Sequence, residues 1–354
     1  MIEPERNAHK YSRRGALTLA GIVAAGGALS GRMAVLAQEA TPPVPTSSLG
    51  WNDELTDNGL LNVATTVAPI SSIVRNIAGT RVNLRGVVPD GVNSHTFEPA
   101  PSDAVILSAA DILIMNGLFL EEPTRELAEA TMADGTEILQ LADLTITDEE
   151  WAFDFSFPED GGHPNPHLWI NVPYAITYAE LAEKKLAERL PGDVDYLAEN
   201  LARYKEVLSR LDAAILVAVQ TIPEQNRKLL TYHDSYAYFA RRYGMTVIGA
   251  VQPSDFSEPS ASEVAALIDQ IRETQVPAVF GSEVFPSDVL EQIADEAGAE
   301  YVAELRDDDP PGEPGSPEHT YIGMMLKNMS LMIPALGGTT EAFEGIIPFD
   351  TWLP

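Results

Sequence analysis

Residues 161–171 combine histidine with a rigid backbone, a combination that suits a metal site. The segment reads GGHPNPHLWIN and carries His163 and His167, two of the six histidines in the chain. Proline fixes its own φ and disfavours helical conformation at the residue before it, so a stiff, non-helical loop is expected here. The preceding residues 143–160 are rich in Asp and Glu. A lone histidine is more often structural, but three similar segments elsewhere favour a metal ligand at His167.

Three further candidate ligands follow the ends of predicted strands. His95 lies in GVNSHTFEPAPSD, His233 in LLTYHDSYAYF and Asp308 in AELRDDDPPGEPG. Ligands of open α/β sheets bind beyond the carboxyl ends of the strands. Two of the four candidates come from each half of the chain, so one ion between the halves could bind all of them. Three imidazoles and a carboxylate form a suitable ligand set for a divalent first-row transition metal.

The elements that must position these residues alternate along the chain. In the first half, strands are predicted at residues 61–67, 82–88, 111–115 and 137–141, and helices at residues 70–77, 101–110, 121–131 and from residue 172 onward. In the second half, strands are predicted at residues 228–231, 246–250, 278–280 and 301–305, and helices at residues 236–243, 260–274, 287–297 and 318–332. This alternation predicts an α/β fold with βα units on parallel sheets. Two lobes are expected, residues 58–193 and residues 223–354, each with its own hydrophobic core.

A long helical pattern between the two halves is predicted to bridge them. Through residues 194–222, apolar side chains recur at spacings of three and four, at Leu197, Leu201, Tyr204, Leu208, Leu211, Ile215 and Val219. Neither Gly nor Pro interrupts the pattern before Pro223, and a helix of this length spans about 40 Å. The alternative is an ordinary core helix of the first lobe. A bridging helix without Gly or Pro cannot absorb large backbone rotations, so closure of the lobes is expected to be small.

The N-terminal residues 1–37 have the pattern of an export signal. Arg13 and Arg14 precede a short run of apolar and small residues, and Ala37 ends a stretch that suits cleavage. The adjacent arginines favour the twin-arginine type, although Ala16 stands where that motif usually has Phe. The apolar run is too short and too rich in glycine for a membrane span. Residues 38–57 are expected to form a flexible tether.

Composition limits the other possibilities. The chain has no cysteine, which excludes a disulfide framework and removes the residue that anchors a bacterial lipoprotein. The protein is therefore expected outside the cytoplasmic membrane, either free or held by an uncleaved signal. The net charge of −31 disfavours binding to nucleic acid or anionic lipid and attracts cations. Strong acidity is also a common adaptation for solubility, so the charge alone does not prove a cation site.

Several motifs together resemble the zinc and manganese receptors of bacterial ABC importers, the metal-binding solute-binding protein family 9. They are HTFEPAPSD, NPHLWIN, YHDSYAYFARRYGM, SEPSASEVAALIDQI and LRDDD, and the resemblance covers about residues 61–336. It implies two α/β lobes joined by one long rigid helix, with the metal bound between them. It also implies an ABC permease with its ATPase as partner, and a monomeric receptor.

The resemblance assigns the ligands residue by residue. The histidine ligands fall on His95, His167 and His233, and the acidic ligand falls on Asp308, with an offset of one to Asp307 or Asp309 left open. His233 makes the set three nitrogens and one oxygen, which suits Zn²⁺. Relatives selective for zinc often carry a His-rich loop, whereas this chain has an acidic, aromatic one, and a bidentate carboxylate would suit Mn²⁺. Because the donor set has three nitrogens and zinc ranks above manganese for sites that contain nitrogen, zinc is nevertheless predicted over manganese.

Other residues and other classes of protein are also considered. His163 is interpreted as an exposed loop residue or an accessory ligand, and His319 as exposed. Glu98, Glu258 and Glu283 could support the ligands, Glu283 alternatively as a ligand itself and Glu98 alternatively as a surface charge. The competing classes are a zinc-dependent hydrolase and a surface adhesin-like metalloprotein. No HExxH helix, nucleophile elbow or Walker loop supports an enzyme.

Overall fold

The computed structural model describes residues 55–252, 259–284 and 288–354. The export signal, Glu258 and most of the predicted tether lie outside the described residues. Among the described residues, no helix combines the length and the apolar character that a membrane crossing requires.

The first half of the chain forms a parallel sheet with strand order β2-β1-β3-β4. The strands are β1 (Leu61–Thr65), β2 (Val82–Gly86), β3 (Ile112–Met115) and β4 (Glu137–Gln140). Helices α1 (Ala68–Ala78), α2 (Pro101–Ala109) and α3 (Glu122–Thr131) connect them. Each of these helices has a proline in its first turn, where the missing N–H costs no helical hydrogen bond. The predicted strands and helices of this half are confirmed.

The second half repeats the arrangement, with strand order β6-β5-β7-β8. The strands are β5 (Lys228–Thr231), β6 (Thr246–Ala250), β7 (Ala278–Ser282) and β8 (Glu300–Leu305). The helices are α6 (Ala237–Tyr243), α7 (Ala261–Thr274), α8 (Asp288–Ala297) and α9 (Tyr321–Ala335). Helix α9 begins three residues later than predicted because Thr320 caps it, its hydroxyl accepting a hydrogen bond from the amide of Gly323. The predicted α/β class with parallel sheets is confirmed.

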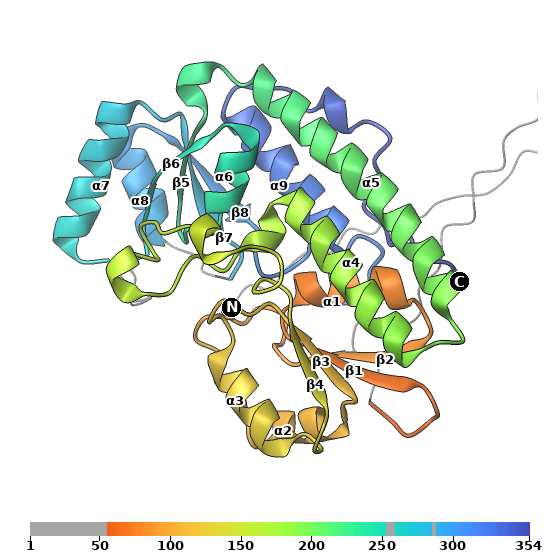
Figure 1. The fold of residues 1–354 in the computed structure, drawn as a ribbon. Coiled ribbons are helices and arrows are strands. Elements are labelled where there is room, and N and C mark those ends of the chain that lie inside the picture. Colours follow the sequence, from red (N-terminus) through yellow and green to blue (C-terminus); the bar gives the residue numbers. More distant parts are fainter. Residues whose placement is uncertain (1–54, 253–258, 285–287) are drawn as a thin grey trace, which may run out of the picture. The chain divides into compact units, whose positions relative to one another are not determined.

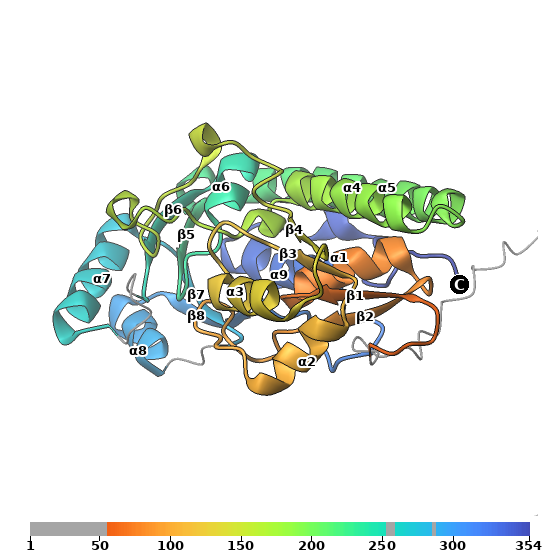
Figure 2. The ribbon, with the colours of Figure 1, turned by 60° about the horizontal axis from the view of Figure 1, so that its bottom comes forward.

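Two long helices follow one another between the sheets in the sequence. Helix α4 (Val172–Arg189) packs beside α5 (Val194–Thr221), as Figures 1 and 2 both show. The 28 residues of α5 contain no Gly or Pro, and the helix contacts α1 from the first half and α6 and α9 from the second. The predicted long helix, residues 194–222, is therefore present with nearly the same bounds.

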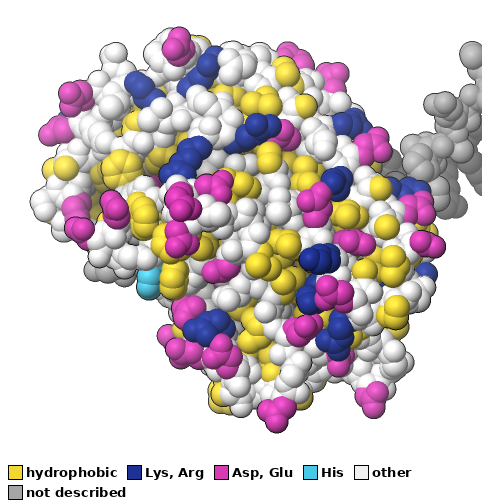
Figure 3. Space-filling model, viewed as in Figure 1, with side chains coloured by type: hydrophobic (Ala, Val, Ile, Leu, Met, Phe, Trp, Pro, Cys, Tyr) yellow, Lys and Arg dark blue, Asp and Glu magenta, His cyan; other side chains and the backbone are white. Residues whose placement is uncertain are grey.

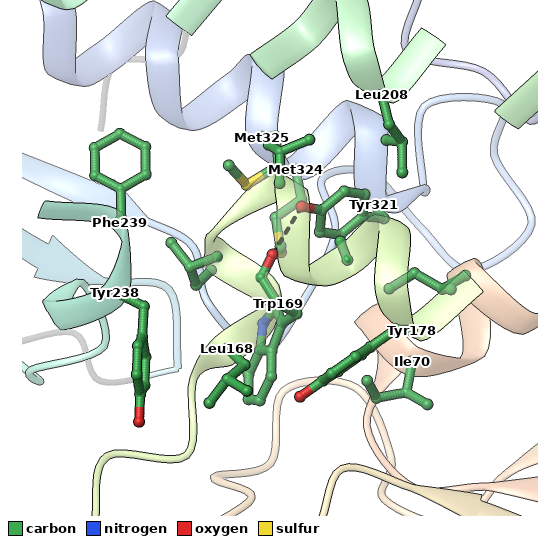
Figure 4. Packing of buried hydrophobic residues seen from close by; sticks show 14 of the residues in the cluster. Ile70, Leu168, Trp169, Tyr178, Leu208, Tyr238, Phe239, Tyr321, Met324 and Met325 are labelled. Carbon is green, nitrogen blue, oxygen red and sulfur yellow. Dashed lines mark hydrogen bonds between the residues drawn. The ribbon is translucent and has the colours of Figure 1, made fainter. Parts of the chain in front are cut away.

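Buried apolar residues of both halves belong to one continuous cluster. It joins Ile70 and Tyr178 from the first half to Phe239 and Met324 from the second, with Trp169 between them (Figure 4). Smaller clusters add to it, one involving the second sheet with α7 and α8, and one involving the first sheet with α2. Each half thus has a core cluster of its own, as expected, but the largest cluster spans both halves, which was not expected. Helix α5 packs against both α4 and α9, and α9 also contacts α1, so the halves share their largest core.

On the face shown in Figure 3, charged residues are spread out rather than gathered by sign. Figure 3 shows Asp and Glu side chains scattered over the whole visible face, with Lys and Arg among them. The negative charge of the chain is therefore distributed on this face, which fits a general attraction for cations rather than one docking patch.

Candidate metal site

Three histidines from distant parts of the sequence meet at one point. His95 lies in the loop after β2, His167 directly precedes a 3-10 turn (Leu168–Ile170), and His233 follows β5. The Nε2 atom of His167 lies 3.1 Å from Nε2 of His95 and 3.2 Å from Nε2 of His233. His167 and His233 are buried and His95 is half-buried. Among the described residues these three form a cluster able to hold a metal ion, with their donor atoms within 4.8 Å of one another.

The carboxylate beside the histidines belongs to Asp307, not to Asp308. Oδ2 of Asp307 lies 3.8 Å from Nε2 of His167 and 4.0 Å from Nε2 of His233. Asp308 instead accepts hydrogen bonds from the amide of Ser94 at 3.3 Å and from its hydroxyl at 3.0 Å. Asp309 accepts one from the amide of Gly91. The geometry therefore favours the residue one position before the predicted ligand.

The orientation of His167 is fixed by Asn165. The side-chain oxygen Oδ1 of Asn165 lies 2.8 Å from Nδ1 of His167, and it also accepts a hydrogen bond from the backbone amide of His167. A carbonyl can only accept, so Nδ1 carries the proton and Nε2 keeps its lone pair for a metal. The Asn165 amide group in turn donates to Oδ2 of Asp154 and to the backbone carbonyl of Asp234, both at 2.7 Å. Asn165 thus links the loop that carries His167 to the strand end that carries His233.

Burial keeps the imidazoles neutral. It lowers the pKa of His233 to about 4, with a hydrogen bond to Gln252 acting in the opposite direction. Burial also lowers the pKa values of His95 and His167 well below the usual range, and the neighbouring histidines add to this effect. Neutral imidazole is the form that binds a metal, so the three nitrogens are ready to coordinate at neutral pH.

The carboxyl groups are shifted in the other direction. Burial, followed by repulsion from Glu283 and Asp308, raises the pKa of Asp307 well above its usual range. Burial and repulsion from Glu283 and Asp309 raise the pKa of Asp308 to about 8. A cluster of buried acids without a cation is unfavourable, and a divalent ion would relieve it.

Aromatic residues enclose the site on two sides. The ring of Phe157 has its centroid 5.5 Å from that of His95 and 5.8 Å from those of His167 and His233. The indole N–H of Trp169 donates to the backbone carbonyl of Asp307 at 2.8 Å, and so holds the acidic turn against the histidine loop. An environment of this kind limits water and strengthens charge interactions inside the site.

A cavity of about 310 Å³ opens beside His95. Its lining includes Phe119, Phe157 and His163. The exposed His163 stacks on Phe119 with ring centroids 4.4 Å apart, away from the cluster of three histidines. The structure therefore places His163 at the mouth of this cavity and not among the candidate ligands.

The remaining residues considered from the sequence have other surroundings. Glu98 is exposed, which agrees with a surface charge. Glu283 accepts hydrogen bonds from the backbone amides of residues 307–309, which form the acidic turn after β8. His319 was expected to be exposed, and this is wrong: it is 1% exposed, with Nε2 3.6 Å from Oδ2 of Asp90 and Nδ1 facing the carbonyl of Gly312.

The chain has two parallel sheets with connecting helices, and histidines from both halves meet at one site. This arrangement is that of a metal-binding solute-binding protein of an ABC importer. The profile of the zinc-uptake complex component A family, described as periplasmic, matches residues 63–334. The chain belongs to this family. Members of this family are extracytoplasmic metal-binding receptors that function with an ABC permease and its ATPase, so the chain is a transport receptor and not an enzyme.

Relatives support this assignment over most of the chain. The manganese-binding lipoprotein MntA of Halalkalibacterium halodurans is 28% identical over 276 residues, covering 78% of this chain and 88% of MntA. The zinc-binding protein TroA of Treponema pallidum is 29% identical over 299 residues, covering 82% of this chain and 93% of TroA. A solved structure of TroA superposes with a TM-score of 0.71 over 78% of this chain and 99% of the TroA chain, at 28% identity. One relative is thus named for manganese and the other for zinc.

Proposed function

We propose that this receptor captures one divalent transition metal ion with His95, His167, His233 and Asp307, and delivers it to the permease. The observation that carries the proposal is the convergence of the three Nε2 atoms, 3.1 and 3.2 Å apart in the two pairs that include His167. Two imidazole nitrogens on one tetrahedral zinc ion, each at about 2.0–2.1 Å, lie about 3.3 Å from one another. The observed spacings of 3.1 and 3.2 Å are close to this value, so binding requires little rearrangement of these imidazoles.

Asp307 is proposed as the fourth ligand in place of Asp308. The Asp308 carboxylate already accepts two hydrogen bonds from Ser94, whereas the Asp307 carboxylate points toward the histidines. Oδ2 of Asp307 lies 3.8 and 4.0 Å from the nitrogens of His167 and His233, and it must move closer on binding because a tetrahedral ion holds its ligand atoms about 3.3 Å apart. Four protein ligands close the coordination sphere of a tetrahedral ion, which suits capture and release rather than catalysis at an open position.

Zinc is proposed as the ion that this site prefers over manganese. Three imidazoles make the donor set rich in nitrogen, and zinc ranks above manganese for nitrogen-containing sites of nearly every kind. Two features act in the other direction: the loop before His167 is acidic rather than His-rich, and a bidentate Asp307 would raise the coordination number. The nitrogen count is the stronger factor because it fixes three of the four bonds.

The organisation of the whole protein is proposed along the same lines. Residues 58–193 and 223–354 act as the two metal-binding lobes, with residues 194–222 as the bridging helix between them. Residues 1–37 direct export, and the receptor acts as a monomer. MntA carries the name of a lipoprotein, but this sequence has no cysteine, so we propose that it is not retained through a lipidated cysteine.

The proposal is tested by metal analysis of the protein isolated from the extracytoplasmic fraction of its native cell. We expect about one equivalent of zinc per chain, removable by a chelator without loss of the fold. A stoichiometric metal other than zinc would refute the preference, and the absence of any bound transition metal would refute the function.

Metal uptake is expected to release protons from the carboxyl groups and not from the imidazoles. With a pKa of about 4, His233 is already neutral between pH 6 and 8, whereas burial holds the pKa values of Asp308 and Asp309 at about 8 and about 7 and raises that of Asp307. The metal competes with these carboxyl protons, so zinc affinity should fall as the pH drops from 8 to 6, by up to about tenfold per unit for one displaced proton.

Calorimetry in two buffers of different ionisation enthalpy measures this proton release directly. The observed binding enthalpies should differ between the buffers for the wild type at pH 7. Equal enthalpies in both buffers would show that no proton leaves and that the acidic turn is ionised before the metal arrives.

A further inference from the structure

One carboxylate oxygen of Glu283 accepts hydrogen bonds from three consecutive backbone amides. Glu283 follows β7 directly, and its Oε1 lies 3.1, 3.1 and 2.9 Å from the amide nitrogens of Asp307, Asp308 and Asp309. These three residues form the turn after β8, the strand paired with β7. We propose that Glu283 is a positioning residue that aims the Asp307 carboxylate at the metal, and this inference rests on the proposed function.

The three hydrogen bonds fix three successive peptide planes, so the three side chains leave the turn in different directions. Asp307 faces His167 and His233, Asp308 reaches Ser94, and Asp309 reaches Gly91. Only one of the three carboxylates is thus presented to the histidines.

The same turn also contacts the loop that carries His95. Ser94, the partner of Asp308, directly precedes His95, and Gly91 lies three residues further back in this loop. Glu283 therefore holds in place both the carboxylate ligand and the surroundings of one imidazole. It is not a ligand itself, because Oε1 is occupied by three amides and Oε2 lies 3.3 Å from the Ser282 hydroxyl.

The test compares three variants of Glu283 by zinc affinity and by the visible spectrum of the Co²⁺-loaded protein. Glu283→Gln keeps a carbonyl oxygen at the same reach and should keep most of the affinity and a wild-type spectrum. Glu283→Asp and Glu283→Ala cannot reach all three amides, and we expect a 10- to 100-fold weaker affinity, of the order that partners of metal ligands contribute. Glu300→Ala, an exposed substitution on β8, is the matched control and should behave as the wild type.

The results separate this inference from the proposed function. Wild-type protein that fails to bind zinc would refute the proposed function. If the wild type binds and Glu283→Ala binds equally well, Glu283 is a structural residue only. If Glu283→Gln loses as much as Glu283→Ala, the negative charge and not the amide contacts is responsible, which also contradicts the proposal.

A second inference concerns residues 337–354, here named the C-terminal strap, and is independent of the metal site. The strap lies beyond the family match, which ends at residue 334. It leaves α9 in the second half of the fold and runs beside α5 toward α1 in the first half, as Figures 1 and 2 both show. Its start is fixed at the C-terminal end of α5, where the Thr339 amide donates to the Thr221 hydroxyl and Gly338 packs too closely for a side chain.

The other end of the strap is fixed by two buried asparagines, one on α1 of the first half and one near the start of α5. Asn76 of α1 accepts from the amide of Thr351 and donates to the carboxylate of Asp350, both at 2.8 Å. Asn200 of α5 accepts from the amide of Leu353 at 2.8 Å. Trp352 is 6% exposed. Between the two ends, the guanidinium of Arg210 on α5 donates to the strap at the carbonyl of Gly345.

We infer that the strap is a second connection between the two halves, parallel to α5, which restrains their relative motion. A single helix can bend or pivot at its ends, whereas two connections anchored at both ends resist this. Because this end is hydrogen-bonded to both α1 and α5, the strap ties the first half to the N-terminal end of the bridging helix.

Distance measurements between spin labels test the restraint. The sequence has no cysteine, so Glu126→Cys on α3 and Glu291→Cys on α8, both exposed, provide unique labels on the two halves. Terminating the chain after Leu336 should broaden the distance distribution and increase the shift caused by zinc, and the double variant Asn76→Ala, Asn200→Ala should do so partly. An unchanged distribution in a truncated chain that is folded by circular dichroism would overturn the inference. If the truncated chain does not fold, an unchanged distribution in the double variant would do the same.

Discussion

Replacing His167 with alanine is expected to abolish high-affinity metal binding while the protein remains folded. His167 is central to the cluster: its Nε2 is the atom that the other two imidazoles and Asp307 all approach. Loss of one of four ligands should weaken zinc binding by more than the 10- to 100-fold that supporting partners contribute. Wild-type protein gains roughly 4 kcal/mol of stability when free zinc is a thousand times its dissociation constant, and the variant should lose this gain.

Thermal unfolding with and without zinc measures the effect, with competition against a chromophoric chelator for the affinity. His163→Ala is the matched control, because this exposed histidine stacks on Phe119 outside the cluster. Its zinc-induced rise in Tm should equal that of the wild type. A full rise in His167→Ala would show that the metal binds elsewhere.

The second large effect is expected on the choice of metal. In His233→Glu a carboxylate replaces one of three imidazoles, so two nitrogens and two carboxylates face the ion. This harder, oxygen-rich set accepts the higher coordination that manganese prefers. We expect the wild type to bind zinc much more tightly than manganese, and the variant to lose a large part of that preference, about tenfold or more for a change of 1.4 kcal/mol in relative binding energy.

Competitive titration of both proteins with zinc and manganese gives the ratio directly. Because burial already keeps His233 neutral, the comparison at pH 7 involves no protonated imidazole at this position. Equal preference in the two proteins would show that the residue at position 233 does not decide the metal.

Most of the fold could be predicted because its elements carry strong local signals. Strand β5 and strand β6 have the predicted bounds, and α5 differs from its prediction by one residue. The start of α9 was missed because the cap residue Thr320 follows a polar segment that also suits a helix. His319, next to that cap, was expected to be exposed because a polar residue at a helix start usually is, whereas the loop after β8 folds back over it.

The shared core could not be predicted from periodicity. A helical apolar pattern shows that one face is buried but not which element covers it. Trp169 illustrates this: its indole N–H binds the backbone of Asp307 and its carbonyl accepts from the hydroxyl of Tyr321, so one residue of the first half packs against two elements of the second (Figure 4).

The three histidines predicted as ligands meet in the structure, and the acid beside them is Asp307, which the sequence left open as an alternative to Asp308. Three consecutive aspartates give no sequence signal for the one that faces the histidines, because Glu283, more than twenty positions earlier, accepts hydrogen bonds from all three backbone amides of the turn. The supporting role of Asn165 was also missed, although its place two residues before His167 allows an oxygen to reach both Nδ1 and the amide. Contacts of this kind depend on backbone angles that residue types do not specify.

The most direct measurement is anomalous scattering at the zinc edge from crystals of the zinc-loaded protein. We expect one strong peak per chain, within bonding distance of Nε2 of His95, His167 and His233 and of the Asp307 carboxylate, with Asp308 still bonded to Ser94. A peak bonded to Asp308 instead of Asp307, or a peak away from the three histidines, would contradict the proposed site.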